Sequence, residues 1–142
     1  MIRVESFNDH PGRRVRHEDM RRTAAAVVRG EGRRNADLRL IFTTDARMRT
    51  LNARWLGRRT TTDVLSFPFD GDGAGTLDGE VYVNLDQARR QAATERVSER
   101  HEIARLVIHG VLHLLGYDDR TPVMKKTMTG KEDGYLRLLD VR

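Results

Sequence analysis

The most apolar stretch of the sequence, residues 106–120 (LVIHGVLHLLGYDDR), predicts a buried helix that ends sharply. Its two histidines, His109 and His113, are four residues apart and therefore lie on one face of that helix. Gly116 stands where a helix often ends, because glycine accepts the left-handed conformation that reverses the chain. The turn that follows can bring the carboxylate of Asp118 or Asp119 back towards the two imidazoles.

This combination of groups predicts a metal site. The pattern HxxxHxxGxxD offers two nitrogen ligands and, from Asp119, one oxygen ligand. Three protein ligands leave one coordination position open, which is typical of catalytic rather than structural zinc. A single histidine in an apolar helix is more often an ordinary core residue with a hydrogen-bond partner. Two on one face, followed by an acidic turn, favour a metal ion.

The basic residues of the chain are almost all arginine. Lys and Arg number 26 against 21 Asp and Glu, so the formal net charge is +5. Arginine binds phosphate through a planar fork of donors and stacks on bases, which favours a nucleic-acid partner; a merely solvated surface is the alternative. The basic character is strongest around the end of a helix expected over residues 45–55. There Arg54, Arg58 and Arg59 are the predicted RNA contacts.

Length and composition limit the organisation of the protein. A chain of 142 residues suits a single domain spanning residues 1–142. It contains no cysteine, which excludes disulfides and thiolate zinc sites. No apolar segment is long enough for a signal peptide or a membrane span, so we expect a cytoplasmic protein without a membrane partner.

The order of the expected elements predicts an α+β fold. Strands are expected at residues 2–7, 36–43, 64–69 and 80–84, and helices over 16–29, 45–55, 86–94, from Ser98 and from Pro122. Pro68 cannot donate to a neighbouring strand, which predicts either an edge position for residues 64–69 or the end of that strand. We therefore predict a small mixed sheet of about four strands, with the metal helix packed on one face and a loop over residues 70–79.

Two kinds of local sequence signal indicate where helices begin and which of their residues are buried. Thr and Asn side chains that can cap a helix stand before three of them, at Thr44, Asn84 and Thr121, and Ser98 begins the long metal helix. Apolar residues at helical spacing predict the buried stripes of the second and the last helix: Met48, Leu51 and Trp55, then Met124, Met128, Leu136 and Leu139.

Three segments together resemble the YbeY family of metal-dependent endoribonucleases and rRNA maturation factors. They are TDVLSFPF at residues 62–69, GEVYV at 79–83 and HGVLHLLGYDD at 109–119. LNARW at 51–55 is similar to the family's preceding helix, and Met128, Glu132 and Leu136 are similar to its C-terminal helix. The resemblance covers most of the chain, with its segments in the family's order.

This resemblance implies a bacterial cytoplasmic enzyme that binds one Zn²⁺ per chain and cleaves single-stranded RNA. It also implies roles in maturation of the 16S rRNA 3′ end and in ribosome quality control, with the small ribosomal subunit as partner. The implied fold is similar to the core of zinc-dependent proteases, a zincin-like core. The family's first two metal histidines fall on His109 and His113, and its third falls on Asp119.

The sequence departs from the family pattern at two positions. Asp119 supplies oxygen where the family has nitrogen, which keeps a zinc site feasible but broadens the choice of metal towards manganese. Asp118 stays open as the alternative third ligand. Where the family has an arginine after an aromatic residue, this chain has Leu56. Arg54 or Arg58 could supply the same guanidinium from a neighbouring position.

Two routes of RNA cleavage and two other functions fit the pattern. Water activated at the metal, or the 2′-hydroxyl of the RNA, can attack the phosphate, and only the second leaves a 2′,3′-cyclic phosphate. No strong general base is evident, and Asp118 is a weak candidate. The ligand spacing also matches metzincin proteases, but these have a glutamate after the first histidine, where this chain has Gly110. The remaining alternative is a non-catalytic ribosome assembly factor with a structural metal.

Overall fold

A computed structural model describes residues 1–70 and 75–142 of the chain. These residues form four strands and five helices, in which strands and helices are intermixed. In chain order the elements are β1 (Ile2–Asn8), α1 (His17–Gly30), β2 (Ala36–Thr43), α2 (Asp45–Leu56), β3 (Val64–Phe69), β4 (Leu77–Asn84), α3 (Leu85–Glu95), α4 (Glu99–Leu114) and α5 (Pro122–Leu138). The predicted α+β class is confirmed.

The four strands form one mixed sheet in the order β1-β2-β4-β3. The strands β1, β2 and β4 run parallel, and β3 pairs antiparallel with β4 at the edge of the sheet. The edge position predicted from Pro68 is therefore confirmed. A proline is tolerated there because its missing amide proton takes no inter-strand hydrogen bond away.

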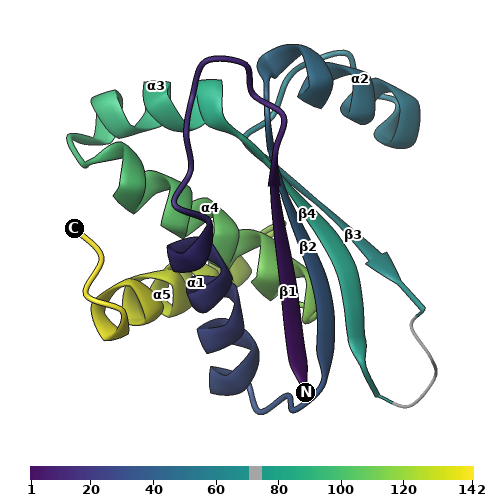
Figure 1. Ribbon diagram of the computed structural model, residues 1–142, viewed down its shortest axis with the longest axis vertical. Coiled ribbons are helices and arrows are strands. Elements are labelled where there is room, and N and C mark those ends of the chain that lie inside the picture. The colour runs from purple at the N-terminus through teal and green to yellow at the C-terminus, as the bar shows by residue number, and fades with distance from the viewer. Residues whose placement is uncertain (71–74) are drawn as a thin grey trace.

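The sheet buries one face against helices. Alternate residues of β2, among them Leu38, Leu40 and Phe42, are fully buried, as are Val81 and Val83 of β4. This alternation follows from the two-residue period of a strand. Figure 1 shows α1, α3, α4 and α5 on one side of the sheet, while α2 lies over one end of the strands on the opposite side.

The central helix of the fold is α4, which contacts α1, α3, α5, β3 and β4. Its apolar side chains are buried nearly all round, including those of Val107, Ile108, Val111 and Leu112. The helix ends as its sequence predicts, with Gly116 at a φ of 102° in the left-handed region. Its end therefore turns sharply and leads the chain back along the helix.

Side-chain caps fix the starts of four helices. The side-chain oxygens of Thr44, Asn84, Ser98 and Thr121 each accept a hydrogen bond from a backbone N–H three residues later, at 3.2, 3.1, 3.0 and 3.1 Å. Each cap satisfies a donor that has no partner within its own helix. The three predicted caps, at Thr44, Asn84 and Thr121, are confirmed, and Ser98, predicted to begin its helix, caps it as well.

Three local predictions need correction. The strand β4 begins at Leu77 rather than residue 80, because Leu77 is buried and pairs with Ala36 of β2. Of the loop predicted over 70–79, residues 71–74 lie outside the described part. Trp55 was expected in a buried stripe but is 61% exposed, since it lies in the last turn of α2. Met124, in the first turn of α5, is likewise exposed.

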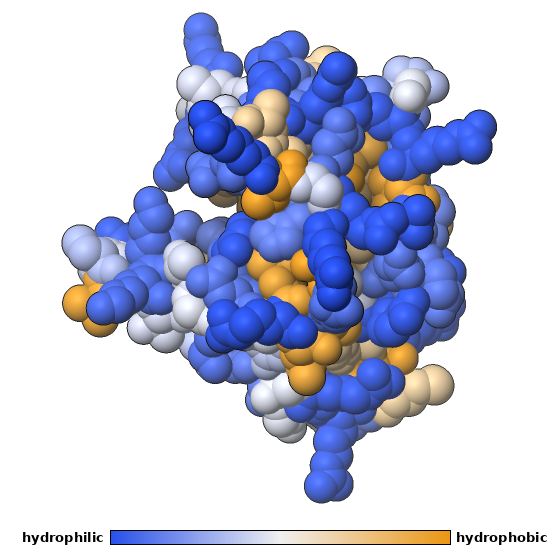
Figure 2. Space-filling model, turned by 90° about the vertical axis from the view of Figure 1, so that its left-hand side faces the viewer, coloured by the Kyte–Doolittle hydropathy of each residue, from blue (hydrophilic) through white to orange (hydrophobic). Residues whose placement is uncertain are grey.

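The helical side of the molecule has a largely hydrophilic surface. Figure 2 shows this side, with hydrophobic side chains gathered in patches near the middle and hydrophilic ones around them. Within residues 1–70 and 75–142, none of the helices is both long enough and apolar enough to span a membrane.

Candidate metal centre

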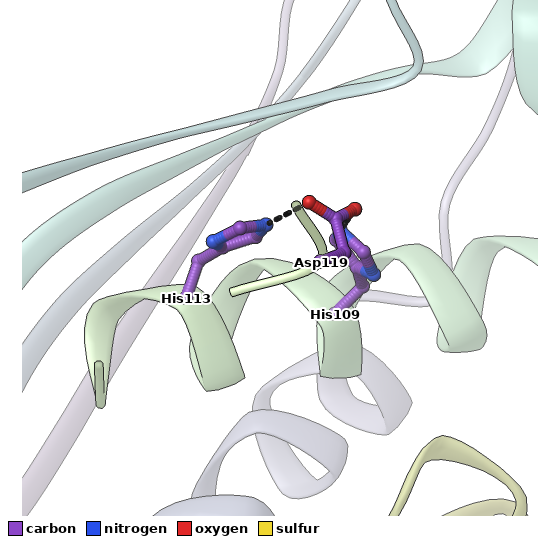
Figure 3. A group of neighbouring side chains, drawn as sticks. All are labelled: His109, His113 and Asp119. Atoms are coloured by element: carbon purple, nitrogen blue, oxygen red, sulfur yellow. Dashed lines mark ion pairs between the residues drawn. The ribbon is translucent and has the colours of Figure 1, made fainter. Parts of the chain in front are cut away.

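The structure brings His109, His113 and Asp119 together on the exposed side of α4. Both imidazoles project from the helix, and Asp119 reaches them from the turn that follows it (Figure 3). The Nε2 atoms of His109 and His113 lie 3.5 and 3.9 Å from the two carboxylate oxygens of Asp119. One ligand atom from each of the three residues lies within 4.8 Å of the others.

This donor set fits a divalent ion. Ligand atoms about 2.0–2.1 Å from a tetrahedral zinc ion are about 3.3 Å apart, so these atoms, which lie within 4.8 Å of one another, would have to draw together by up to about 1.5 Å. Two imidazole nitrogens and one carboxylate oxygen suit zinc and also harder divalent metals. Asp119 is 41% exposed, so the site opens towards solvent and a substrate can reach it.

A buried carboxylate on α5 supports the first histidine. Glu132, only 6% exposed, has an oxygen 2.6 Å from Nδ1 of His109. Since an ionised carboxylate can only accept, Nδ1 carries the proton and Nε2 is left free to bind a metal. The second Glu132 oxygen accepts a hydrogen bond from Arg105 at 2.9 Å, and Arg105 also donates to Asp133 at 2.6 Å. Glu132, itself held by Arg105, therefore fixes the orientation of the His109 imidazole through its Nδ1 atom.

The two imidazoles differ in their electrostatic surroundings. Burial lowers the pKa of His109, but the hydrogen bond to Glu132 and the negative charges of Glu132, Asp119 and Asp63 outweigh it, so the pKa is raised. Burial, followed by repulsion from His109, lowers the pKa of His113. His113 is therefore the imidazole that is more readily neutral, the form that binds metal.

The neighbouring carboxylate, Asp118, is engaged elsewhere. It accepts a hydrogen bond from the backbone N–H of Asp119 at 2.7 Å and forms an ion pair with Arg120. The hydrogen bond from Asp119, aided by Arg120, lowers the pKa of Asp118. Among the described residues, the metal-ligand group contains Asp119 and not Asp118. Of the two carboxylates left open by the sequence, the geometry favours Asp119 as the third ligand.

The turn that carries Asp119 is anchored to the rest of the protein. Glu31, just after α1, accepts hydrogen bonds from the hydroxyl of Tyr117 at 2.6 Å and from Lys131 at 3.1 Å. The hydroxyl of Tyr135 donates to the same carboxylate. Because Tyr117 lies two residues before Asp119, these contacts restrict where the third ligand can move. The end of α1 and the helix α5, which are far apart in the sequence, thus hold one short turn.

Close packing excludes a glutamate after the first histidine. A Cβ atom added to Gly110 would lie 2.4 Å from a methyl carbon of Val81. The carbonyl of Gly110 also accepts a hydrogen bond from the hydroxyl of Ser66 on β3 at 2.8 Å. The helix α4 therefore approaches β3 and β4 too closely for any side chain at this position, and the general base of a metzincin protease has no place here.

The arginines predicted to bind RNA lie in α2 and just after it, and are not part of the group of three metal-ligand residues. Arg54 is in the last turn of α2, with its guanidinium 5.4 Å from the centre of the Trp55 ring. Arg58 and Arg59 follow α2, and all three arginines are exposed. Leu56, where the resemblance leads one to expect an arginine, is exposed as well.

Glu132 and Glu31 were not among the residues predicted to form the site. Glu132 follows Met128 and precedes Leu136 at four-residue spacing, so a carboxylate stands in an otherwise apolar helical stripe. An acidic group in a buried stripe needs a partner, and this was the available signal. Glu31 lies in a polar loop and carries no comparable signal.

Comparison with known proteins shows which family the chain resembles. The family model described as Endoribonuclease YbeY matches residues 7–140. An Endoribonuclease YbeY of Anaeromyxobacter sp. (strain Fw109-5) is 40% identical over 130 residues, which are 91% of this chain and 68% of that protein. The Salinibacter ruber protein of the same name is 38% identical over 136 residues, covering 91% and 87%.

A solved structure is also similar. The solution structure of TM1509 from Thermotoga maritima aligns with a TM-score of 0.66 and 26% identity, covering 98% of this chain and 89% of that one. The mixed sheet, the five helices and the matched sequences together define a nuclease, a class of hydrolase. The chain belongs to the YbeY endoribonuclease family.

Proposed function

We propose that this protein is a single-strand-specific, metal-dependent endoribonuclease that matures the 3′ end of 16S rRNA and acts in ribosome quality control. The observation that carries the proposal is the convergence of His109, His113 and Asp119 in a chain of the YbeY endoribonuclease family. RNA as substrate follows from the name of the relatives. Single-stranded rRNA of the small ribosomal subunit is the target that the family resemblance implies.

The proposed cofactor is one Zn²⁺ per chain, held by His109, His113 and Asp119. When bound, such an ion supplies Lewis acidity towards a phosphate oxygen and lowers the pKa of water. Glu132 keeps the proton of His109 on Nδ1 and so presents Nε2 to the site. The carboxylate of Asp119 makes manganese a realistic alternative to zinc.

Arg54, Arg58 and Arg59 are the proposed RNA-binding residues. In the part of the chain that the structure describes, no carboxylate forms an ion pair with any of them. Their guanidinium groups are therefore available for phosphate, in contrast to the many arginines that are paired with Asp or Glu. They take over the role that an arginine at position 56 would have.

We further propose that residues 1–142 act as one catalytic domain with a zincin-like core. One sheet and one hydrophobic core support this proposal, because that core joins α1, β2, β4, α4 and α5. The proposed place of action is the cytoplasm, where the small ribosomal subunit is assembled. The subunit itself is the proposed partner.

Cleavage of an unstructured RNA tests the function directly. The protein is stripped of metal, then given zinc or manganese, and wild type is compared with His113→Ala and Asp119→Ala. We expect cleavage only with metal and a loss of at least a hundredfold in both variants. Glu102→Gln, a change at a buried carboxylate that contacts Gln91 instead, is the control and should cleave normally. Metal-independent cleavage, or cleavage unaffected by both variants, contradicts the proposal.

The exposed Leu56 favours a second candidate function, a non-catalytic assembly factor with a structural metal. In that case the protein would bind rRNA through Arg54, Arg58 and Arg59 but leave it intact. The same samples separate the two functions, since the second predicts binding without products. If products form, a 2′,3′-cyclic phosphate at their ends identifies attack by the 2′-hydroxyl.

A further inference from the structure

The side chain of Trp55 is unusually open to solvent for so large an apolar group. It is 61% exposed, and it is the only tryptophan of the chain. One edge rests against Phe67 of β3, with ring centres 6.4 Å apart and an interplanar angle of 64°. Phe67 in turn meets Tyr82 of β4 at 5.7 Å and 85°. The indole is thus held in place by an aromatic row while much of its surface stays in water.

Positively charged residues adjoin this exposed indole, one lying over its ring and two following it in the chain. The Arg54 guanidinium lies 5.4 Å from its ring centre, and Arg58 and Arg59 follow a few residues later. Where the structure describes the chain, these three arginines form no ion pair. Arg39, on the same outer face of the sheet, forms ion pairs with Asp37, Asp78 and Glu80. Arg54, Arg58 and Arg59 therefore keep an unbalanced positive charge, and that of Arg54 lies beside Trp55.

The indole lies one strand away from the metal centre. Side chains of β3 alternate between the two faces of the sheet. Ser66 points inward and donates to the carbonyl of Gly110, the residue after His109. Phe67, its neighbour, points outward to Trp55. Only the edge strand β3 separates the face with the metal ligands from the face with the open indole.

We propose that Trp55 is a base-stacking residue for single-stranded RNA, with Arg54, Arg58 and Arg59 binding the adjacent phosphates. The nature of the substrate rests on the proposed function, whereas the stacking site rests on the exposed indole and the unpaired arginines. Stacking on an aromatic ring is available to every base, and a strand that stacks there can cross β3 towards His109 and His113. A double helix hides its bases and cannot use the site.

The side chains of Trp55, Arg54, Arg58 and Arg59 favour RNA over a protein as the binding partner. A protein interface needs a contiguous apolar core, whereas here the Arg54 guanidinium lies over the indole, and two more arginines without ion pairs, Arg58 and Arg59, follow it in the chain. A chain of phosphates with splayed bases matches both features at once. The combination of an open aromatic face and unpaired arginines is therefore complementary to single-stranded nucleic acid.

Intrinsic fluorescence reports this contact without a label, because Trp55 is the sole tryptophan. Metal-free protein is titrated with oligo(A) RNA of about eight nucleotides, with an abasic oligomer of the same length, and with a duplex. We expect strong quenching by oligo(A) and little by the other two. Metal-free conditions prevent cleavage, so the result does not depend on nuclease activity.

Binding of labelled oligo(A) to variants provides the second measurement. Trp55→Ala should weaken binding roughly tenfold, and Trp55→Phe should restore most of it, because a phenyl ring still stacks. Phe7→Ala is the matched control. Phe7 is an exposed aromatic residue on β1, at the opposite edge of the sheet, and its removal should leave binding within about twofold of wild type.

Two results would overturn the proposal directly: equal quenching by the abasic oligomer, or unchanged oligo(A) binding by Trp55→Ala. A third would be a Trp55→Ala variant that binds the small ribosomal subunit more weakly but binds oligo(A) as the wild type does. The last would assign Trp55 to a protein contact. A cleavage assay on the same samples separates this proposal from the proposed function. Quenching without cleavage supports stacking and rejects the nuclease; cleavage without quenching rejects stacking alone.

Discussion

The Nδ1 atom of His109 lies 2.6 Å from a carboxylate oxygen of Glu132, and this contact joins the ligand helix α4 to the last helix of the chain. Arg105 binds the other oxygen of Glu132 and so holds the carboxylate in place. A carboxylate behind a metal-binding histidine fixes its tautomer and increases its basicity. The candidate metal centre therefore draws on two helices, although its three predicted ligands come from only one of them and the turn that follows it.

Removing this support should weaken metal binding without unfolding the protein. We expect Glu132→Gln to lower zinc affinity about 10- to 100-fold, because the amide no longer stabilises the proton on Nδ1 of His109. Competition with a chromophoric chelator measures the affinity. Glu102→Gln is the matched control, since Glu102 is equally buried but contacts Gln91. Equal affinities in both variants would show that Glu132 does not support the site.

The oxygen ligand should set the balance between metals. Asp119→His replaces an oxygen donor by nitrogen and should raise the ratio of zinc to manganese affinity, on the order of tenfold. Separate titrations of the metal-free protein with the two ions measure this ratio. Asp118→His is the control, because Asp118 is held by Arg120 and the backbone of Asp119. A larger change in the control would assign the third ligand to Asp118.

The packing of α4 against β4 should leave no room for a side chain at position 110, next to His109. Gly110→Ala places a carbon 2.4 Å from Val81 and should lower the free energy of unfolding by about 1–3 kcal/mol. Gly130→Ala, on α5, meets nothing within 4 Å and should raise it by about 0.5–1 kcal/mol. Urea unfolding measures both. A shift of the same sign in the two variants would mean that the contact between α4 and β4 is looser than described.

An acid-sensitive ion pair joins α2 to α3. Arg90 donates two hydrogen bonds to Asp45, at 2.9 and 2.7 Å, and thereby lowers the pKa of Asp45 from 3.8 to about 2. A carboxyl group with a lowered pKa stabilises the fold above its unfolded pKa, and this stabilisation is lost as the pH falls from about 4 to about 2. Because Arg90 is half exposed, the contribution is about 1 kcal/mol rather than the full shift.

We therefore expect Asp45→Asn to lower the free energy of unfolding by about 1 kcal/mol at pH 7 and by almost nothing at pH 2. Urea unfolding across this pH range measures the difference between variant and wild type. Asp140→Asn removes a highly exposed ion pair with Arg142 and should change little at any pH. A difference for Asp45→Asn that stays constant down to pH 2 would contradict the assignment.

Features encoded by neighbouring residues were predictable from the sequence. The four helix caps depend on one side chain and a backbone group three residues away. The proximity of His109 to His113 depends only on the helical repeat, and the approach of Asp119 depends on the turn at Gly116. The edge position of β3 followed from the missing amide proton of Pro68.

Features that depend on distant packing were not predictable in the same way. Glu132 reaches His109 across 23 residues of sequence, and only the packing of α5 on α4 brings them together. The exposure of Trp55 depends on where α2 leaves the sheet, which its apolar spacing with Met48 does not reveal. The early start of β4 at Leu77 depends on pairing with β2, because the local composition there is that of a loop.

Metal content by elemental analysis, on protein purified without a histidine tag, tests the central claim most directly. We predict about one zinc or manganese ion per chain in the wild type and in Glu102→Gln, and a loss of that ion in His109→Ala, His113→Ala and Asp119→Ala. Retention in Asp119→Ala alone would transfer the third ligand to another residue. A wild-type protein that holds no metal, even after zinc or manganese is supplied, would contradict the account.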